Sequence, residues 1–369
     1  MQKNINIKLQ FLKQLLNITS PIIQAPMAGG ATTPEFVAAV SNQGCLASIG
    51  AGYLSGDQLS FHIQKTKSLT SRVFSVNLFV PEESTVDLEK IINMQLRLNK
   101  FRAELGIPLK ESYDHTEDFH KKFQQQIDIV LSNDIKILSF TFGIPPEKVM
   151  RDLKDKGVVL IGTATNVTEG KLLEAAGCHA IVAQGVEAGG HRGTFSSKPE
   201  NALLGLMAFV PQLVDAVNIP VIAAGGIMDG RGVIASLALG ASGVQIGTAL
   251  LTCEESGISA TYKQALLAAS GEQTQFTDAF SGKNARGIEN SFMRELRECC
   301  NNPGYPIQHY LTTDIRQAAA AQGRTDLLSL WAGQSVGGKY QTVESVQKKL
   351  SDVVKEVFDL INEFKNIDY

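Results

Sequence analysis

Residues 180–193 have the sequence AIVAQGVEAGGHRG, in which a short apolar run leads directly into a loop with four glycines. Apolar residues at successive positions are typical of a parallel strand that is buried on both faces. Seven similar runs occur elsewhere, and most are followed by a turn and then a helical pattern. The eight predicted strands are Ile22–Ala25, Cys45–Ile49, Val73–Phe79, Ile135–Phe140, Val158–Thr163, Ala180–Gln184, Val221–Ala224 and Gly243–Ile246. Strand–helix alternation repeated eight times predicts an α/β fold of the (β/α)8 TIM barrel type.

Two stretches depart from this repeat. Residues 81–133 are too long and too polar for one crossover, so we predict a helical insertion there. Beyond residue 255 helical patterns dominate. The predicted helices include Pro34–Asn42, Glu117–Leu131, Val167–Ala176, Gly230–Leu239, Ala260–Ala269, Ser291–Cys299, Asp314–Gln322 and Val343–Phe364. We therefore expect residues 1–255 to form the ligand-binding barrel and residues 256–369 a smaller, mainly helical region on its substrate side.

The composition restricts the class of protein. The chain has 369 residues, of which 44% are hydrophobic and 19% charged, and its formal net charge is -3. These values fit a folded globular protein, and the slight acidic excess argues against a nucleic-acid partner. The sequence has no run of 18 apolar residues, which argues against a membrane partner, and we interpret its first residues as a leading segment rather than a signal peptide. Its five cysteines form no CxxC pair, and Cys299 and Cys300 are expected to be free thiols, so we expect no metal site and a cytoplasmic location.

In such a barrel, the loops after the carboxyl ends of the strands form the active site. The small residues APMAGG at 25–30 follow the first predicted strand and would let a flat ligand approach the backbone. Glycine turns at Gly225-Gly226 and Gly247-Thr248 follow the last two strands, where such barrels hold a phosphate with backbone N–H groups and a helix N-terminus. Tight structural turns are the alternative in each case. Asn77, inside the third predicted strand, needs hydrogen-bond partners from either the fold or a ligand.

His191 is the strongest candidate for chemistry. A histidine on a mobile glycine loop at the barrel mouth is suited to proton transfer near pH 7, although it would equally fit a solvated loop. His309 lies in a rigid segment with Tyr305 and Tyr310, which we expect either to wall the pocket or simply to pack. The sequence contains no GxGxxG, GxxxxGK[ST], HExxH or GxSxG motif, so it lacks the signatures of Rossmann, P-loop, zinc-peptidase and serine-hydrolase sites.

An ordered set of motifs resembles the nitronate monooxygenases, formerly called 2-nitropropane dioxygenases, which are FMN-dependent barrel enzymes. The set covers most of the chain, and its last segments resemble the bacterial class I branch. It comprises QAPMAGG at 24–30, Asn77, Gln184, EAGGH at 187–191, AGGI at 224–227, QIGT at 245–248, YPIQ at 305–308 and LWAGQ at 330–334. One departure is Ala249-Leu250, where many relatives have Arg-Phe; we expect this change to alter outer phosphate contacts without abolishing FMN binding.

The resemblance implies a role for each matching residue. His191 corresponds to the catalytic histidine that faces the substrate, and Gly190 and Tyr305 are expected to wall the substrate pocket. The expected FMN-binding residues are Ala25, Pro26 and Met27 along the flavin ring, Asn77 and Gln184 as its hydrogen-bond partners, and Gly189, Gly225, Gly226, Gln245, Ile246, Gly247 and Thr248 along the ribityl chain and phosphate.

The implied activity is the oxidation of alkyl nitronates, such as propionate 3-nitronate, by dioxygen to a carbonyl compound and nitrite, as a detoxification. A protonated His191 would attract the anionic nitronate, whereas a neutral His191 would remove the α-proton of a nitroalkane. We expect a monomer or homodimer. The alternatives are an FMN-dependent enoyl-thioester reductase that uses NAD(P)H, a non-catalytic flavin-binding protein, and a flavin-free barrel that binds a phosphorylated metabolite.

Overall fold

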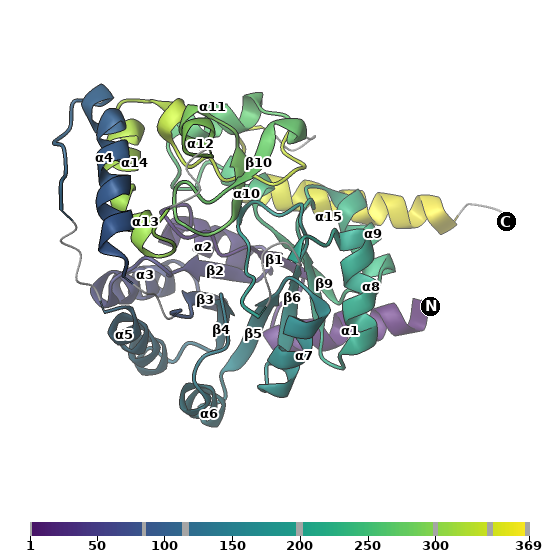
Figure 1. Ribbon diagram of the computed structural model, residues 1–369. Coiled ribbons are helices and arrows are strands. Elements are labelled where there is room, and N and C mark those ends of the chain that lie inside the picture. The colour runs from purple at the N-terminus through teal and green to yellow at the C-terminus, as the bar shows by residue number, and fades with distance from the viewer. Residues whose placement is uncertain are drawn as a thin grey trace.

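The computed structural model describes residues 2–82, 86–112, 118–196, 202–297, 302–337 and 342–365. Eight parallel strands form a barrel, helices cover its outer side, and the helices of the C-terminal third gather at one end of it (Figure 1). The predicted (β/α)8 barrel is therefore confirmed. Three strands have the predicted bounds, and the ends of the other five shift by at most two residues, for example from Cys45–Ile49 to Ala47–Gly50.

The strands of the barrel are β1 (Ile22–Gln24), β2 (Ala47–Gly50), β3 (Phe74–Phe79), β4 (Ile137–Thr141), β5 (Val159–Ala164), β6 (Ala180–Gln184), β8 (Val221–Ala224) and β9 (Gly243–Ile246). Their order is β1-β9-β8-β6-β5-β4-β3-β2, and every neighbouring pair is parallel. Backbone hydrogen bonds from Gln24 N to Leu46 O and from Leu46 N to Ile22 O join the two end strands. Closure brings all eight carboxyl ends to one mouth.

The helices that alternate with these strands pack on the outside of the barrel. They are α2 (Pro34–Asn42), α3 (Gly56–Leu69), α5 (Phe119–Ser132), α6 (Glu147–Asp155), α7 (Val167–Ala175), α8 (Leu206–Ala216) and α9 (Gly230–Ala238). Their buried faces join the outward-facing strand residues in the largest apolar cluster of the described residues. Phe123, Ile127 and Val130 place α5 in this cluster, so α5 is the barrel helix that follows β3 and not part of an insertion.

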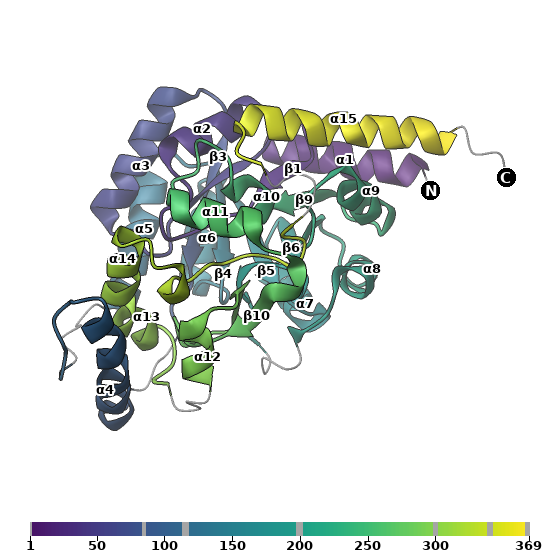
Figure 2. The same cartoon turned by 90° about the horizontal axis from the view of Figure 1, so that it is seen from above.

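The excursion within residues 81–133 is the helix α4 (Leu88–Glu104), which leaves the barrel and lies beside the C-terminal helices (Figures 1 and 2). The C-terminal helices are α10 (Thr248–Leu251), α11 (Ala260–Ala268), α12 (Ser291–Arg297), α13 (Ile307–Leu311) and α14 (Thr313–Ala321), and α13 and α14 are the ones beside α4. Ile91, Leu98 and Phe101 of α4 share a second apolar cluster with Phe292 of α12 and Ile315 of α14. The packing therefore divides residues 81–133 between the two apolar clusters. The predicted domain boundary between residues 255 and 256 stays a prediction.

The N-terminal residues form a helix that belongs to the barrel. In α1 (Gln2–Leu16), the side chains of Leu12 and Leu16 are fully buried. They pack among inward-facing residues near the strand starts, such as Ile23, Ile137 and Ile161. The segment that the sequence analysis treated only as a leader thus fills the amino-terminal end of the barrel.

A small antiparallel sheet lies outside the barrel, and the sequence analysis did not predict it. It consists of β10 (Thr274–Thr277), β11 (Ala285–Ile288) and β7 (Gly190–His191), with β11 in the centre. His191 is opposite Ala285 in the register. His191 therefore lies in a short strand that the C-terminal third supports, and not on a mobile glycine loop.

The last described helix, α15 (Val346–Lys365), packs against α9 and α2. Val346, Leu350 and Val353 are buried on its inner face, as the spacing of three and four predicts. Val343, which the sequence analysis placed in this helix, precedes it and is 51% exposed. Within the described ranges, none of the helices combines the length and the apolar character that crossing a lipid bilayer requires.

Three of the cysteines are buried free thiols, at Cys45, Cys178 and Cys253. Burial raises their pKa values to about 11, 12 and 12, respectively. These thiols are therefore protonated at neutral pH and poor nucleophiles. Cys299 and Cys300 lie outside the described residues.

Candidate active site

A cavity of about 940 Å³ lies at the carboxyl ends of the strands. Its volume is in the range of small-molecule and cofactor sites, roughly 300–1,000 Å³. Most of the residues that the sequence analysis assigned to the site line it. They are Ala25, Pro26, Met27, Gln184, Gly189, Gly190, His191, Gly225, Gly226, Gln245, Gly247 and Thr248. The fold thus brings these residues together, and their individual roles stay predictions.

Three assigned residues lie behind or beside this cavity. Asn77 and Ile246 are each 1% exposed and are not among the residues that line it. The amide nitrogen of Asn77 donates to Ser139 Oγ at 2.9 Å, so the fold supplies a partner for it. Tyr305 lines a small adjoining pocket, together with Tyr53.

The glycines of the cavity wall are required by close backbone contacts. Gly225 and Gly226 have φ angles of +126° and +67°, which side-chain-bearing residues rarely adopt. A Cβ atom on Gly189 would lie 2.6 Å from the backbone nitrogen of Gly333. At Gly247, an added Cβ would meet Ala25 Cβ at 3.3 Å. Backbone rather than side chains therefore forms this end of the cavity.

A segment near the C-terminus covers the glycine turns. Gly333 N donates to Thr248 Oγ1 at 3.0 Å, and Ser335 Oγ donates to Gly226 O at 2.7 Å. Gln334 N donates to Glu187 O at 2.9 Å, so the same segment also contacts the loop after β6. The covering segment, residues 331–335, thus joins the loops that follow β6, β8 and β9.

The N-terminus of α9 already has anionic partners. Asp229 Oδ1 accepts a hydrogen bond from Gly232 N at 3.1 Å, and Glu356 Oε2 accepts one from Gly230 N at 2.9 Å. A phosphate at this helix end would meet both carboxylates. An anion at this side of the cavity would therefore contact the glycine turns and not the start of α9.

The backbone around His191 is fixed on both sides. Gln184 Nε2 donates to His191 O at 2.9 Å, and Gly193 N donates to Gln184 Oε1 at 2.8 Å. Both ends of the Gln184 amide thus hold this strand, and the expected hydrogen bond from Gln184 to the flavin stays a prediction. Farther along, Glu169 Oε1 accepts hydrogen bonds from Phe195 N and Ser196 N at 2.8 and 3.1 Å.

The loop before His191 folds around two charged side chains, of Arg192 and Glu187, that do not line the cavity. Arg192 is 3% exposed and donates to Gly185 O, Gln184 O and Ala202 O at 2.6 to 2.9 Å. Burial lowers the pKa of Arg192 to about 10, so it is still protonated at neutral pH. Glu187 Oε1 accepts from Leu206 N at 2.9 Å. Arg192 and Glu187 therefore shape the loop rather than contact a ligand.

The imidazole of His191 has one firm polar contact, 2.8 Å from its Nε2 to Ser281 Oγ. The Ser281 hydroxyl also donates to Lys283 O at 3.1 Å. A hydroxyl has one proton, so this arrangement favours the tautomer in which Nε2 carries the hydrogen and donates to Ser281. The lone pair of His191 is then on Nδ1.

The surroundings of His191 favour its neutral form. Burial lowers the pKa of His191 to about 3, and the positive charges of Lys283 and Arg316 act in the same direction. Aromatic rings supply the apolar surroundings: the ring centroids of Phe142, Tyr305 and Trp331 lie 5.9, 6.2 and 5.4 Å from that of His191. At pH 7 the imidazole is therefore a potential base and not a cation.

One face of α14 forms the opposite wall of the cavity. Thr313, Arg316, Gln317 and Ala320 all line it, at the spacing of one helix face. Tyr53 stacks on His309 with centroids 4.0 Å apart and an interplanar angle of 9°. Both His309 and Tyr310 also line the cavity, so the segment after Tyr305 is a wall of the site.

Several wall residues were not identified from the sequence, namely Phe142, Trp331, Ser281, Arg316 and Tyr53. For Phe142 a signal existed, because it directly follows β4 at the barrel mouth; its φ of 75° is unusual for a bulky residue. The other four come from loops and helices whose approach depends on the tertiary fold. Among the described residues, no group of three or more His, Cys, Asp or Glu side chains is arranged to hold a metal ion.

Comparison with known proteins identifies the family. The family model for nitronate monooxygenase matches residues 10–356. The chain belongs to the nitronate monooxygenase family. This confirms the resemblance found in the sequence. As a member of the nitronate monooxygenase family, the chain is a flavin-dependent oxidoreductase, and this confirms the predicted enzyme class.

Individual relatives agree with this assignment. The chain is 45% identical over 351 residues to a probable nitronate monooxygenase of Staphylococcus saprophyticus, covering 94% of this chain and 97% of that protein. It superimposes on the nitroalkane oxidase of Streptomyces ansochromogenes with a TM-score of 0.88 and 35% identity, covering 96% and 99% of the two chains. FabK of Thermotoga maritima is similar with a TM-score of 0.76 and 27% identity, covering 96% and 98%. The predicted oligomeric state and cytoplasmic location stay predictions.

Proposed function

We propose that this member of the nitronate monooxygenase family uses FMN and dioxygen to oxidise small alkyl nitronates, such as propionate 3-nitronate, to a carbonyl compound and nitrite. The central observation is that His191 lies in an aromatic cavity that continues to the glycine turns after β8 and β9. Removal of toxic nitronates is the cellular role that we infer from this activity.

The residues present fit a flavin mononucleotide. Its phosphate would meet the backbone at Gly225, Gly226 and Gly247, where there is no side chain to exclude it. Its ring would lie along Ala25, Pro26 and Met27, which line the same cavity. The covering segment 331–335 is bonded over the glycine turns, which favours a mononucleotide over a dinucleotide that would extend farther.

When bound, FMN supplies the redox chemistry, whereas the protein supplies binding, orientation and proton transfer. The lowered pKa keeps His191 neutral at pH 7, so its Nδ1 lone pair is free to accept the α-proton of a nitroalkane, and the anionic nitronate that forms beside it would stabilise the imidazolium. The sequence left open whether His191 acts as a cation or as a base, and its surroundings favour the base. A substrate that is already a nitronate would need no such step, so its oxidation depends less on His191.

The cavity suits an anionic, partly apolar substrate. Phe142 and Trp331 flank His191 and keep water from the reacting end. No Asp or Glu of the described residues lines the cavity, whereas Lys122 and Arg316 do. This charge distribution favours an anion such as a nitronate.

Spectra and product analysis of the purified protein test the proposal. We expect a flavin absorption spectrum, release of FMN on denaturation, and oxygen uptake that is coupled to nitrite formation with propionate 3-nitronate. A colourless protein would support the flavin-free barrel, and a yellow protein without nitrite release would support a non-catalytic flavin protein.

A second measurement separates the reductase alternative. Under anaerobic conditions NADPH is expected to leave the flavin absorbance unchanged. Rapid bleaching by NADPH, together with turnover of an enoyl thioester, would overturn the proposal in favour of the reductase.

A further inference from the structure

We propose that Arg316 is an anion subsite of the active-site cavity, which binds a carboxylate carried by the carbon chain of the nitronate substrate. The inference rests on the proposed function and makes it more specific: the preferred substrates are dianions, with a nitronate at one end and a carboxylate at the other.

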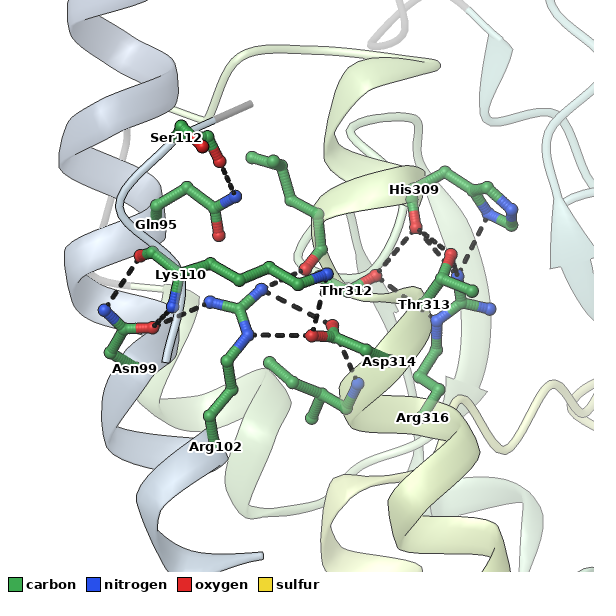
Figure 3. Close-up of polar contacts among 12 residues, drawn as sticks. Gln95, Asn99, Arg102, Lys110, Ser112, His309, Thr312, Thr313, Asp314 and Arg316 are labelled. Atoms are coloured by element: carbon green, nitrogen blue, oxygen red, sulfur yellow. Dashed lines mark hydrogen bonds and ion pairs between the residues drawn. The ribbon is translucent and has the colours of Figure 1, made fainter. Parts of the chain in front are cut away.

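The guanidinium of Arg316 is anchored on one side only. Its Nε donates to Thr312 Oγ1 at 3.2 Å, and Nη2 donates to His309 O at 2.9 Å and to Thr313 Oγ1 at 3.1 Å. Nη2 also lies 3.2 Å from His309 Nδ1. Figure 3 shows these contacts and the second terminal nitrogen of Arg316, which has no contact with the residues drawn. Arg316 lines the cavity, so this nitrogen is available to a ligand there.

The charge of Arg316 is not neutralised by its surroundings. The acid closest to it in the chain, Asp314, has its Oδ2 2.9 Å from Arg102 Nε and 3.0 Å from Lys110 Nζ. Two cations already share this carboxylate, and Figure 3 shows it on the α4 side of α14. Within the described part of the chain, no carboxylate forms an ion pair with Arg316.

A partly buried cation without a counter-ion is costly unless a ligand supplies one. Burial lowers the pKa of Arg316, but an arginine stays charged at neutral pH. A planar guanidinium suits a carboxylate because the two can form parallel, charge-assisted hydrogen bonds.

The location of Arg316 fits the far end of a short substrate. Arg316 lines the same cavity as His191, and its charge is among the causes that lower the pKa of His191. The two residues therefore face a common space, with His191 at the reacting carbon and Arg316 at the other end. A substrate held at both ends is oriented as well as bound, which favours reaction.

The experiment compares two nitronates of equal chain length. Oxygen uptake is measured with propionate 3-nitronate and with propyl-1-nitronate, for the wild type and for Arg316→Gln. We expect Arg316→Gln to lower kcat/KM for the carboxylated substrate by about 10- to 100-fold, mainly through KM. For propyl-1-nitronate we expect a change of less than about threefold. Arg316→Lys keeps the charge and should retain part of the preference.

Lys122→Gln is the matched control, because it removes the same charge from the lining of the same cavity. We expect it to reduce the preference for the carboxylated substrate less than Arg316→Gln does. Equal losses in the two variants would mean that the net charge, and not a subsite at Arg316, attracts the substrate, and would overturn the inference.

Binding of ligands that do not react can be measured independently of catalytic turnover. Trp331 is the only tryptophan in the sequence and lines the cavity, so its fluorescence reports on binding there. Succinate mimics the dianion and butyrate lacks one of its charges; we expect Arg316→Gln to weaken succinate binding selectively. Equal losses for both ligands, or no loss, contradict the subsite. A wild type that oxidises neither nitronate refutes the proposed function, whereas the succinate result still decides on Arg316.

Discussion

The Nε2 atom of His191 lies 2.8 Å from Ser281 Oγ, and this contact joins the strand β7 to the loop that precedes β11. Ser281 in turn donates to Lys283 O, which fixes the direction of the contact. The serine hydroxyl therefore determines which ring nitrogen of His191 is available as a base.

Replacing Ser281 tests this relationship. Ser281→Ala should lower kcat/KM for neutral nitroalkanes by about tenfold, because part of the His191 population adopts the other tautomer or another ring orientation. Oxidation of preformed nitronates should fall less, since it needs no proton removal. Steady-state rates with nitroethane and ethyl nitronate measure the two effects, and equal losses would assign Ser281 a purely structural role.

The lowered pKa of His191 also predicts a pH dependence of stability. The unfolded histidine takes up a proton near its ordinary pKa of about 6.5, whereas the folded one does so near about 3. Between these values the unfolded chain binds more protons, so the free energy of unfolding falls as the pH decreases through this window.

His191→Asn should remove that contribution. Urea unfolding of both proteins at about pH 7.5 and about pH 4.5 should show a smaller decrease for the variant. Parallel decreases in the two proteins would mean that His191 titrates near its ordinary value in the folded state.

Gly247 offers a test of the flavin site that leaves the fold intact. A Cβ at this position would have Ala25 Cβ as its nearest neighbour, at 3.3 Å, and would project beside the expected flavin position. Gly247→Ala should reduce the FMN content after purification while the melting temperature of the flavin-free protein changes little. Gly189→Ala is the contrasting variant, because its Cβ would lie 2.6 Å from backbone atoms and should lower that melting temperature.

The ion pair between Arg102 and Asp314 attaches α4 to α14. The side chain of Arg102 is fully buried and donates to Asp314 Oδ2 at 2.9 Å and to Leu311 O at 2.8 Å. Arg102→Ala should lower the free energy of unfolding by about 3 kcal/mol, because it removes a fully buried side chain and its hydrogen bonds to Leu311 O and Asp314, although Asp314 keeps its ion pair with Lys110. Lys100 is on the same helix as Arg102 and forms an exposed ion pair with Glu295 of α12. Lys100→Ala should have little effect in the same denaturation assay.

The barrel was predictable because its strands carry their own signal. Runs such as Val221–Ala224 are buried on both faces, so every position is apolar and the pattern does not depend on partners. The sheet of β10 and β11 gives no such signal, because short segments such as Ala285–Ile288 contain both a glycine and an arginine and are strands only through pairing. The formation of β10 and β11 therefore depends on tertiary contacts.

The cavity residues divide in the same way. Glycines at the strand ends could be found because barrel geometry fixes where those turns lie. Arg316 could not, since a charged residue on an amphipathic helix is usually solvated, and only the position of α14 over the mouth gives it another environment. His191 could be recognised as a site residue from the sequence. Its strand conformation could not be predicted, because it depends on pairing with Ala285.

The pairing of His191 with Ala285 has a consequence for biosynthesis. The ribosome completes every strand of the barrel before it makes β10 and β11, so a nascent chain can close its scaffold while the imidazole still lacks its support. Completion of the active site therefore waits for the late-translated third of the polypeptide, and a chain that terminates before β11 would lack the strand that supports His191.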